Sequence, residues 1–421
     1  MKRRIFRITL AIAAAAAMCL GASSCKKKES PTFHAPVADD PGEKTGAFDV
    51  EVGKALPAWE EGVLDIHAVN SGRGECTFFI MPDGTTLVVD AGDMFGYKNA
   101  SYDNVPARPN STAIPYETYA KYMLNFLPTG HNNLDYLLVT HYHGDHVGNM
   151  SSGTRTKDAE GGYILAGVTG LYSQLPFKTI IDRSYPDYSQ TAMTSDVTKM
   201  DFYTSFIDYN VKNRGLKAEK FKIGTDQQIV SNYKKNGSYP DWKVFGYARG
   251  GVYWDGSAEI NKNMTAENAM SCAFLLSYGK FDYFTSGDLN NNNVCSPVAQ
   301  QIGKRIEAEK CQHHMSNASP YGVEYDVYQA QVVVTQSFYV RTVQPEQAII
   351  KGYAATQDMF FTNIDDSLTS ASPDIYNPCK GINGHVVIRV ASGGDKFYVY
   401  MLDDTDYEYK VKSIHGPYTC Y

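Results

Sequence analysis

The segment "LLVTHYHGDHVGNM", Leu137–Met150, places three histidines and an aspartate within six residues, directly after an apolar run. A continuous apolar run of this kind is typical of a strand that is buried on both faces. Side chains two positions apart in an extended segment share a face, so His141, His143 and Asp145 are expected to converge, with His146 where the chain turns. Imidazole nitrogens and carboxylate oxygens are good ligands for divalent metals. The segment therefore predicts a metal-binding loop at the end of a buried strand.

Strand-like and helix-like segments alternate around this loop. Runs rich in β-branched and aromatic residues predict strands, and apolar residues at helical spacing predict helices. Their alternation is typical of α/β layering. We expect strands at 62–70, 75–82, 85–92, 134–141 and 178–184, helices at 115–128, 163–176 and 196–214, a hairpin at 271–288, a helix at 296–310, and mainly strands within 330–402.

The N-terminal segment has the layout of a secretory signal. A basic start is followed by an apolar run from Ile8 to Leu20, which is short for a membrane-spanning helix, and by small residues before Cys25. This arrangement resembles a bacterial lipoprotein signal, so we expect residues 1–24 to be removed and Cys25 to be lipidated, with simple cleavage as the alternative. Either way the protein is exported. With lipidation it is anchored to a membrane, facing the periplasm or the cell exterior, and residues 25–59 form a flexible tether.

Charge and cysteine spacing narrow the function classes. The formal net charge is −7, which provides no global basic surface, so we expect no specific nucleic-acid partner. The cysteines after Cys25 are scattered and form no C-x-x-C pair, which argues against a thiolate metal site or a disulfide scaffold. A bridge between Cys379 and Cys420 and buried free thiols are the two alternatives.

The histidine segment also resembles the signature of a known superfamily, the metallo-β-lactamase-fold hydrolases, in which the pattern is H-x-H-x-D-H. Other segments match in the expected order, namely "TTLVVDAGD" with Asp90, "YFTSGDL" with Asp288, and "KCQHHMSNAS" with His313 and His314. The last segment and the opening "GVLDIHAVNSGRGECTFFIMPDGTTLVVDAGD" are similar to the branch that includes the hydrolase domain of DNA-uptake competence proteins and the phosphorylcholine esterases. The resemblance runs from about Gly62 to the last strands.

This resemblance implies a fold and a metal site. The fold is an αββα sandwich within one domain at 60–421, in which two mixed sheets lie face to face with helices outside and the metal loops along one edge. The site holds two divalent ions, zinc with manganese or iron as alternatives, with Asp288 bridging them and Asp90 supporting the loop. The implied ligands are His141 and His143 for one ion, and Asp145, His146 and one of His313 and His314 for the other. Of this last pair we favour His314 as the ligand and His313 as a catalytic group.

Two positions depart from the family pattern. No histidine occurs between His146 and His313, although many members have one there. Asp182, at the end of an apolar strand, could replace it as an oxygen ligand, or it could simply pair with Arg183. Met315 stands where the branch has glycine, and it could narrow the pocket or alter a backbone contact.

The expected activity is hydrolysis by an exported, metal-dependent enzyme. The branch that the chain resembles includes phosphodiesterases, and two ions that share a hydroxide suit in-line displacement at phosphorus. We therefore favour a phosphodiesterase acting on small-molecule or envelope-derived phosphoesters. Asp145 would orient the hydroxide, and His313 would stabilise the developing negative charge. A β-lactam or lactone hydrolase is the alternative enzyme. A surface binding lipoprotein that keeps the fold without turnover is the alternative outside enzymes.

Overall fold

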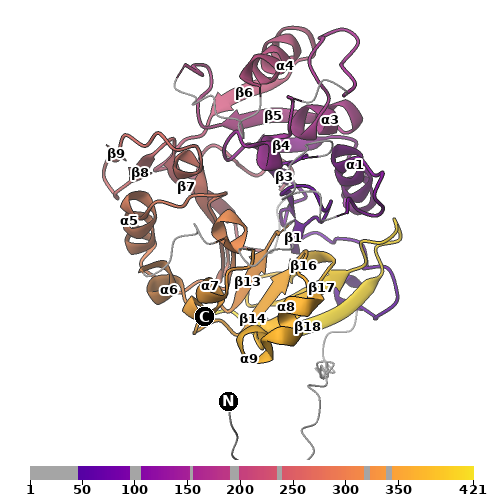
Figure 1. Ribbon diagram of the computed structural model, residues 1–421, viewed down its shortest axis with the longest axis vertical. Helices are drawn as coiled ribbons and strands as arrows, with labels where there is room; N and C mark the ends of the chain where they lie inside the picture. Colours follow the sequence, from indigo (N-terminus) through magenta and orange to yellow (C-terminus); the bar gives the residue numbers. More distant parts are fainter. Residues whose placement is uncertain are drawn as a thin grey trace, which may run out of the picture. The chain divides into compact units, whose positions relative to one another are not determined.

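Two nine-stranded mixed sheets organise the residues that the computed structural model describes (Figure 1). These residues are 46–94, 106–151, 155–189, 199–234, 239–316, 323–337 and 344–421. The first sheet has the order β18-β17-β16-β1-β2-β3-β4-β5-β6, and the second has the order β15-β14-β13-β12-β11-β10-β7-β8-β9. In each sheet antiparallel strands on one side give way to parallel strands on the other, at β3–β4 and at β11–β12.

The strands of the two sheets have the following bounds. The first sheet contains β1 (Leu64–Ala68), β2 (Thr77–Ile80), β3 (Thr86–Val89), β4 (Leu134–Leu138), β5 (Phe177–Asp182), β6 (Lys217–Lys220), β16 (His385–Val390), β17 (Lys396–Leu402) and β18 (Val411–Thr419). The second contains β7 (Trp242–Arg249), β8 (Val252–Trp254), β9 (Glu259–Asn261), β10 (Ala273–Tyr278), β11 (Phe281–Thr285), β12 (Ala308–Lys310), β13 (Val332–Thr335), β14 (Asp358–Phe361) and β15 (Cys379–Ile382).

Helices connect these strands. The α-helices are α1 (Pro115–Phe126), α2 (Gly144–Val147), α3 (Gly167–Gln174), α4 (Met200–Asn213), α5 (Asn292–Ile302), α6 (Val323–Tyr328), α7 (Gln347–Gly352), α8 (Asp366–Ala371) and α9 (Pro373–Tyr376). Three short 3-10 helices are η1 (Gly46–Phe48), η2 (Asn268–Met270) and η3 (Gln312–Met315).

An apolar layer joins the two sheets. The ring of Phe79 on β2 lies 5.7 Å from that of Tyr283 on β11 and 6.2 Å from that of Phe274 on β10. Strand β4 is buried along its whole length, with Leu138 in this layer and Leu137 under the helices. Helices α1, α3 and α4 cover the outer face of the first sheet, and α5, α6 and α7 cover that of the second. The expected αββα sandwich is therefore confirmed.

Two segments differ from the expected secondary structure. The helix expected at 296–310 ends at Ile302, because Gly303 adopts a left-handed conformation (φ 59°) that closes the helix. Residues 308–310 instead form β12, which pairs in parallel with β11 and β13. The segment "QAIIKGY", expected as a strand, contains α7, whose first turn is capped by the Glu346 side chain.

Residues 46–59, which we expected to belong to the tether at 25–59, pack against the first sheet. The fully buried Arg389 forms an ion pair with Asp65 and also donates hydrogen bonds to the carbonyls of Ala47 and Pro57. A buried guanidinium has more donors than one carboxylate can accept, so the chain around these carbonyls is held in place. Cys25 and the signal segment lie outside the described residues. Within the described residues, no helix is long and apolar enough to span a membrane.

The six cysteines of the described residues are free and buried. Cys379 and Cys420 are among them, so the structure has the free-thiol alternative rather than a bridge between these two residues. Burial raises the pKa of the Cys379 thiol to about 12 and also raises that of the Cys420 thiol, which keeps both protonated and unreactive.

We predict that the Asp65–Arg389 pair makes a pH-dependent contribution to stability. Burial opposes ionisation of Asp65, but Arg389 and His67 outweigh it and lower the pKa to about 2 from 3.8. A lowered folded-state pKa stabilises the protein above the unfolded pKa, and this stability is lost as the pH falls through the folded value. At neutral pH, Arg389→Met should therefore lower the free energy of unfolding by about 3–5 kcal/mol in urea titrations, because it leaves a buried carboxylate unpaired.

The same measurement on Asp65→Asn tests the charge directly. The difference in unfolding free energy between this variant and the wild type should be constant above about pH 5 and shrink towards pH 2. A difference that does not change over this range would contradict the pairing.

Candidate metal centre

The predicted metal-binding residues meet at the ends of strands from both sheets. His141, His143 and His146 follow β4 of the first sheet, and Asp288 follows β11 of the second. His314 lies in η3, directly after β12. Because these strands end at the same edge of the sandwich, side chains far apart in the sequence form two adjoining groups of possible ligands.

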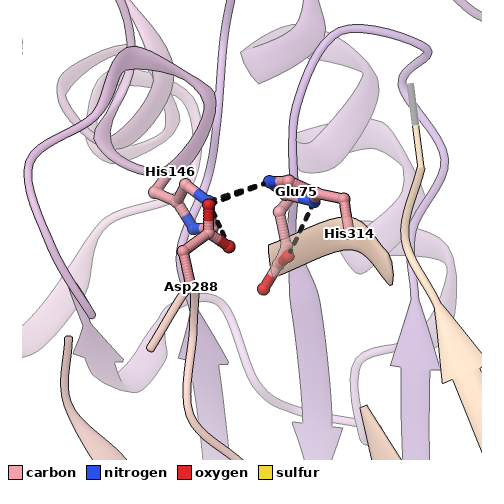
Figure 2. Close-up of side chains that lie close together, drawn as sticks. All are labelled: Glu75, His146, Asp288 and His314. Carbon is pink, nitrogen blue, oxygen red and sulfur yellow. Dashed lines mark hydrogen bonds and ion pairs between the residues drawn. The ribbon is translucent and has the colours of Figure 1, made fainter. Parts of the chain in front are cut away.

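The first group consists of Glu75, His146, Asp288 and His314, all buried and with ligand atoms within 4.8 Å of one another. Figure 2 shows these four side chains pointing toward one another. His146 Nε2 lies 3.1 Å from Asp288 Oδ1 and 3.2 Å from His314 Nε2. His314 Nε2 lies 3.2 Å from Asp288 Oδ2. Two nitrogens and a carboxylate thus converge on one point.

The second group consists of His141, His143 and Asp288, again with ligand atoms within 4.8 Å. His141 Nε2 lies 3.1 Å from His143 Nδ1 and 3.9 Å from Asp288 Oδ2. Asp288 is the one residue common to both groups. This is the place expected of a carboxylate that bridges two ions.

The donor atoms fit a divalent cation. Histidine nitrogens face each other at 3.1 and 3.2 Å in the two groups, an arrangement that a shared cation would stabilise. Asp288 Oδ1 is buried and accepts no hydrogen bond within the described residues. The histidines His146 and His314 lower the pKa of Asp288 well below its usual value, although burial opposes this, so the carboxylate is available as a ligand.

Asp90 orients the histidine loop from behind, as the resemblance implies. Its carboxylate accepts hydrogen bonds from the backbone and hydroxyl of Thr140, at 2.7 and 2.6 Å, and lies 2.8 Å from His146 Nδ1. The opposite nitrogen, Nε2, is thereby directed at the first group. On the other side, His314 Nδ1 lies 2.8 Å from the carbonyl of Gln336, which directs its Nε2 to the same point. Partners of this kind fix the orientation and tautomer of metal-binding histidines.

A close backbone contact explains the glycine of the Asp-x-Gly segment. A Cβ atom on Gly92 would lie 1.7 Å from the carbonyl oxygen of Asp145, which no rearrangement of side chains could relieve. The same carbonyl accepts a hydrogen bond from the amide of Glu75. The histidine loop therefore rests directly on the backbone of two neighbouring loops of the first sheet.

Asp145 lies beside the groups rather than within them. Its Oδ2 is 3.4 Å from His314 Nε2, and it belongs to neither set of ligand atoms. Burial opposes its ionisation, but His146 and His314 lower its pKa to about 2. Asp145 is thus an ionised carboxylate at the margin of the first group.

The adjacent histidines His313 and His314 have different environments. The side chain of His314 is 2% exposed and joins the first group, whereas that of His313 is 18% exposed, with Nε2 3.8 Å from Asp288 Oδ2. His313 also contacts Asn268 Nδ2 at 3.0 Å and Ser316 Oγ at 2.8 Å. His314 is therefore the member of the pair that lies in the first group, and His313 lies at the open side of the site.

The backbone separates these two histidines at a conformational cost. His313, His314 and Met315 are consecutive residues in the left-handed region, with φ of 47°, 55° and 56°. Side chains disfavour this region, and such strain is retained where the surrounding structure requires it. The conformation explains why glycine suits position 315. The Met315 side chain packs into the apolar layer under the helices of the second sheet, so it does not narrow the site as we considered.

Asp182 does not join either group, which corrects the expectation that it completes the first metal site. Its Oδ1 accepts hydrogen bonds from the amides of Ser184 and Tyr185, and its Oδ2 from the hydroxyls of Tyr188 and Tyr203. These four bonds use its acceptor capacity and fix the turn after β5. The expectation was wrong because strand-end position alone does not distinguish a ligand from a turn residue.

The alternative expectation, that Asp182 pairs with Arg183, is also wrong. Arg183 forms its ion pair with Glu267, with Nη2 at 2.7 and 2.9 Å from the two carboxylate oxygens, and lies over the ring of Tyr142. Glu267 also accepts the amide of Tyr142, between the two histidines of the second group. The segment around η2 therefore holds the histidine loop from a third side, which the sequence analysis did not foresee.

Glu75 is the principal residue that the sequence analysis missed. It is fully buried and contributes to the first group, with Oε2 3.4 Å from His314 Nδ1. A signal was present in "SGRGECTFFI", where a single acidic residue stands between small residues and an apolar strand. Acidic residues are seldom fully buried unless they are paired, so this context pointed to a buried function.

Comparison of the sequence with family models and with curated proteins gives no match. Among solved structures, the chain is similar to Zn2+-bound PqqB from Methylobacterium extorquens, with 11% identity, a TM-score of 0.38, and coverage of 77% of this chain and 99% of that chain. It is similar to human tRNase Z, short form, with 9% identity, a TM-score of 0.31, and coverage of 73% of this chain and 94% of that chain. It is also similar to a candidate metal-dependent hydrolase from Parabacteroides distasonis, with 11% identity, a TM-score of 0.29, and coverage of 76% of this chain and 91% of that chain.

We predict that Asp90 and Asp182, two buried aspartates at the ends of β3 and β5 of the first sheet, differ in their effect on metal binding. Asp90→Asn removes the charge that orients His146, so zinc affinity should fall roughly 10- to 100-fold in chelator competition. Asp182→Asn should keep the zinc stoichiometry and affinity of the wild type, while lowering the melting temperature through its lost hydrogen bonds. Loss of one zinc in Asp182→Asn would restore Asp182 as a ligand.

Proposed function

We propose that the chain is a metal-dependent hydrolase of the metallo-β-lactamase fold. The observation that carries this proposal is that Asp288 is shared by two groups of histidines at one edge of the sandwich, all of them buried except the half-buried His143. A carboxylate common to two adjoining ligand sets suits a two-ion site. A protein that only binds its partner would have no use for so many buried ionisable groups, which are costly to hold close together.

The ligands follow from the two groups. His141, His143 and Asp288 would hold one ion, and His146, His314 and Asp288 the other. Zinc suits these imidazole and carboxylate donors, with manganese or iron as alternatives. When bound, the ions would lower the pKa of water towards neutrality and stabilise negative charge on the substrate.

Asp145 and His313 are the proposed catalytic residues. Asp145 remains ionised at neutral pH, since its pKa is about 2, so it can accept a hydrogen bond from the attacking water and orient it. Burial lowers the pKa of His313, although Asp288 opposes this, and the ring lies at the open side of the site. In this structure its Nε2 accepts from Asn268 Nδ2, so it would have to exchange that contact for a proton before it donates to a substrate oxygen on which negative charge develops.

The proposed substrate is a phosphodiester. Two supports favour this class: the similarity of the "KCQHHMSNAS" segment to a branch that includes phosphorylcholine esterases, and the suitability of a two-ion site for in-line displacement at phosphorus. A small or envelope-derived phosphoester would agree with an exported protein.

We predict about two zinc ions per chain and cleavage of bis(p-nitrophenyl) phosphate, measured on the purified chain by metal analysis and absorbance. Cleavage should fall by roughly 10²–10⁴ in Asp145→Asn, because the attacking water loses its acceptor. p-Nitrophenyl phosphate and nitrocefin serve as comparison substrates, and faster turnover of nitrocefin would favour the lactam or lactone alternative. A chain without bound metal and without turnover would exclude both enzyme proposals.

Export and anchoring belong to the same proposal. With Cys25 lipidated, the wild-type chain should partition into the membrane fraction, and mass spectrometry of its N-terminal peptide should show the added acyl mass. Cys25→Ala should move the chain to the soluble fraction, because the anchor is lost. Membrane association that persists in Cys25→Ala would contradict lipidation as the anchor.

A further inference from the structure

A buried lysine lies directly behind the two groups of ligands. Lys310 belongs to β12, and its Nζ is fully buried, 2.7 Å from Glu75 Oε2 and 2.7 Å from the carbonyl of Gly287. Asp288 Oδ1 is a further 3.8 Å contact. An ammonium group in the interior is costly unless it is paired and hydrogen-bonded, so these contacts are what keep it there.

Glu75 joins this lysine to the histidine loop. The backbone of Glu75 donates a hydrogen bond to the Asp145 carbonyl and accepts one from the amide of Gly92, both at 2.8 Å. Its backbone is thus fixed to the first sheet, while its side chain pairs with Lys310 of the second. The ion pair therefore bridges the two sheets at the edge where the ligand groups meet.

Lys310 also contacts the turn that carries Asp288. The Gly287 carbonyl accepts hydrogen bonds from Lys310 Nζ and from the amide of His313, at 2.7 and 3.2 Å. Gly287 has a left-handed conformation (φ 54°), and a Cβ atom there would lie 2.6 Å from Thr140 Oγ1. The turn before Asp288 is therefore packed tightly against the histidine loop, with Lys310 holding its carbonyl.

We propose that Lys310 and Glu75 form a charge-neutral positioning pair, in which the lysine holds Glu75 as a support for the site and not as a metal ligand. The pair sets the spacing between the histidine loop and Asp288. This inference rests on the proposed function only in requiring that the cluster binds metal. The competing interpretation is that Glu75 is the fourth ligand of the first group, since its carboxylate lies within that group.

The two interpretations differ in what a second substitution does. Glu75→Gln leaves Lys310 as an unpaired buried cation 3.8 Å from Asp288 Oδ1, so it should weaken zinc binding under either interpretation. Adding Lys310→Met removes that cation. If Glu75 only balances and positions the lysine, the double variant should regain binding. If Glu75 is a ligand, the double variant should stay as weak as the single one.

The experiment measures zinc stoichiometry, zinc affinity by chelator competition, and melting temperature for Glu75→Gln, Lys310→Met and the double variant. We expect at least a tenfold loss of affinity and a melting temperature lower by several degrees in Glu75→Gln. We expect the double variant to bind two zinc ions roughly threefold or more tighter than Glu75→Gln, because the unpaired cation is gone, but still more weakly than the wild type, because the spacing set by the pair is lost. Lys178→Met is the matched control, because Lys178 pairs with Asp135 at 2.7 Å but is half exposed and remote from the groups.

The outcomes separate this inference from the proposed function. A double variant no better than Glu75→Gln, or a Glu75→Gln variant with unchanged affinity, would overturn the positioning pair. If Glu75→Gln does not fold, the double variant tests the inference by itself. The inference requires the double variant to fold and to bind zinc. Zinc binding without phosphoester turnover would remove the proposed substrate and leave the pair intact. A wild-type chain that binds no zinc would overturn both.

Discussion

The contact between the Asp288 carboxylate and the histidines around it is the interaction on which the rest of the site depends. Asp288 comes from the second sheet, whereas His141 and His146 come from the first, at 3.9 and 3.1 Å. A buried carboxylate and buried imidazoles are each unfavourable alone, so the two sheets must end together at this edge for either to be tolerated. Asp90 contacts the outer nitrogen of His146, and the Gln336 carbonyl contacts that of His314, so both histidine rings are held in orientation toward Asp288.

The parts of the site that are local in sequence could be predicted from it. The apolar run before His141 identified a strand buried on both faces, and the spacing within the histidine segment identified a convergent loop. The supporting role expected of Asp90 came from the family resemblance, and its carboxylate lies 2.8 Å from His146 Nδ1. The sequence left the choice between His313 and His314 open, with a preference for His314, and His314 is the one that lies in the first group. In each case the deciding residues lie within one strand and the turn that follows it.

The parts that depend on distant packing could not be predicted. Asp182 has the same sequence context as a ligand, a carboxylate at the end of an apolar strand, but two tyrosine hydroxyls and two amides use its oxygens. Glu75 lies in the site beside Lys310, a residue distant in sequence and from the other sheet, with which it pairs. The sequence shows which residues carry charge, but the partner of a buried charge depends on the three-dimensional arrangement.

The strained turn at η3 shows how one short segment serves two purposes. Three consecutive left-handed residues point His314 into the buried group and leave His313 at the open side. Both histidines have a ring nitrogen within 4 Å of Asp288 Oδ2. Adjacent side chains also diverge in a regular helix or strand, but there they would point too far apart for both to contact one carboxylate oxygen. Strain in the backbone is thus compensated by the packing of Met315 and the hydrogen bonds around it.

The packing of residues 46–59 has a consequence for where the site can act. Arg389 fixes Ala47 and Pro57 to the sheet. If Cys25 carries a lipid, as we propose, the residues between Cys25 and Gly46 would separate that lipid from the domain. A chain of that length can extend at most about 70 Å, at roughly 3.3–3.6 Å per residue. An anchored enzyme would then reach only molecules close to its own membrane, so proximity to the bilayer would act as a selection among substrates alongside the chemistry of the site.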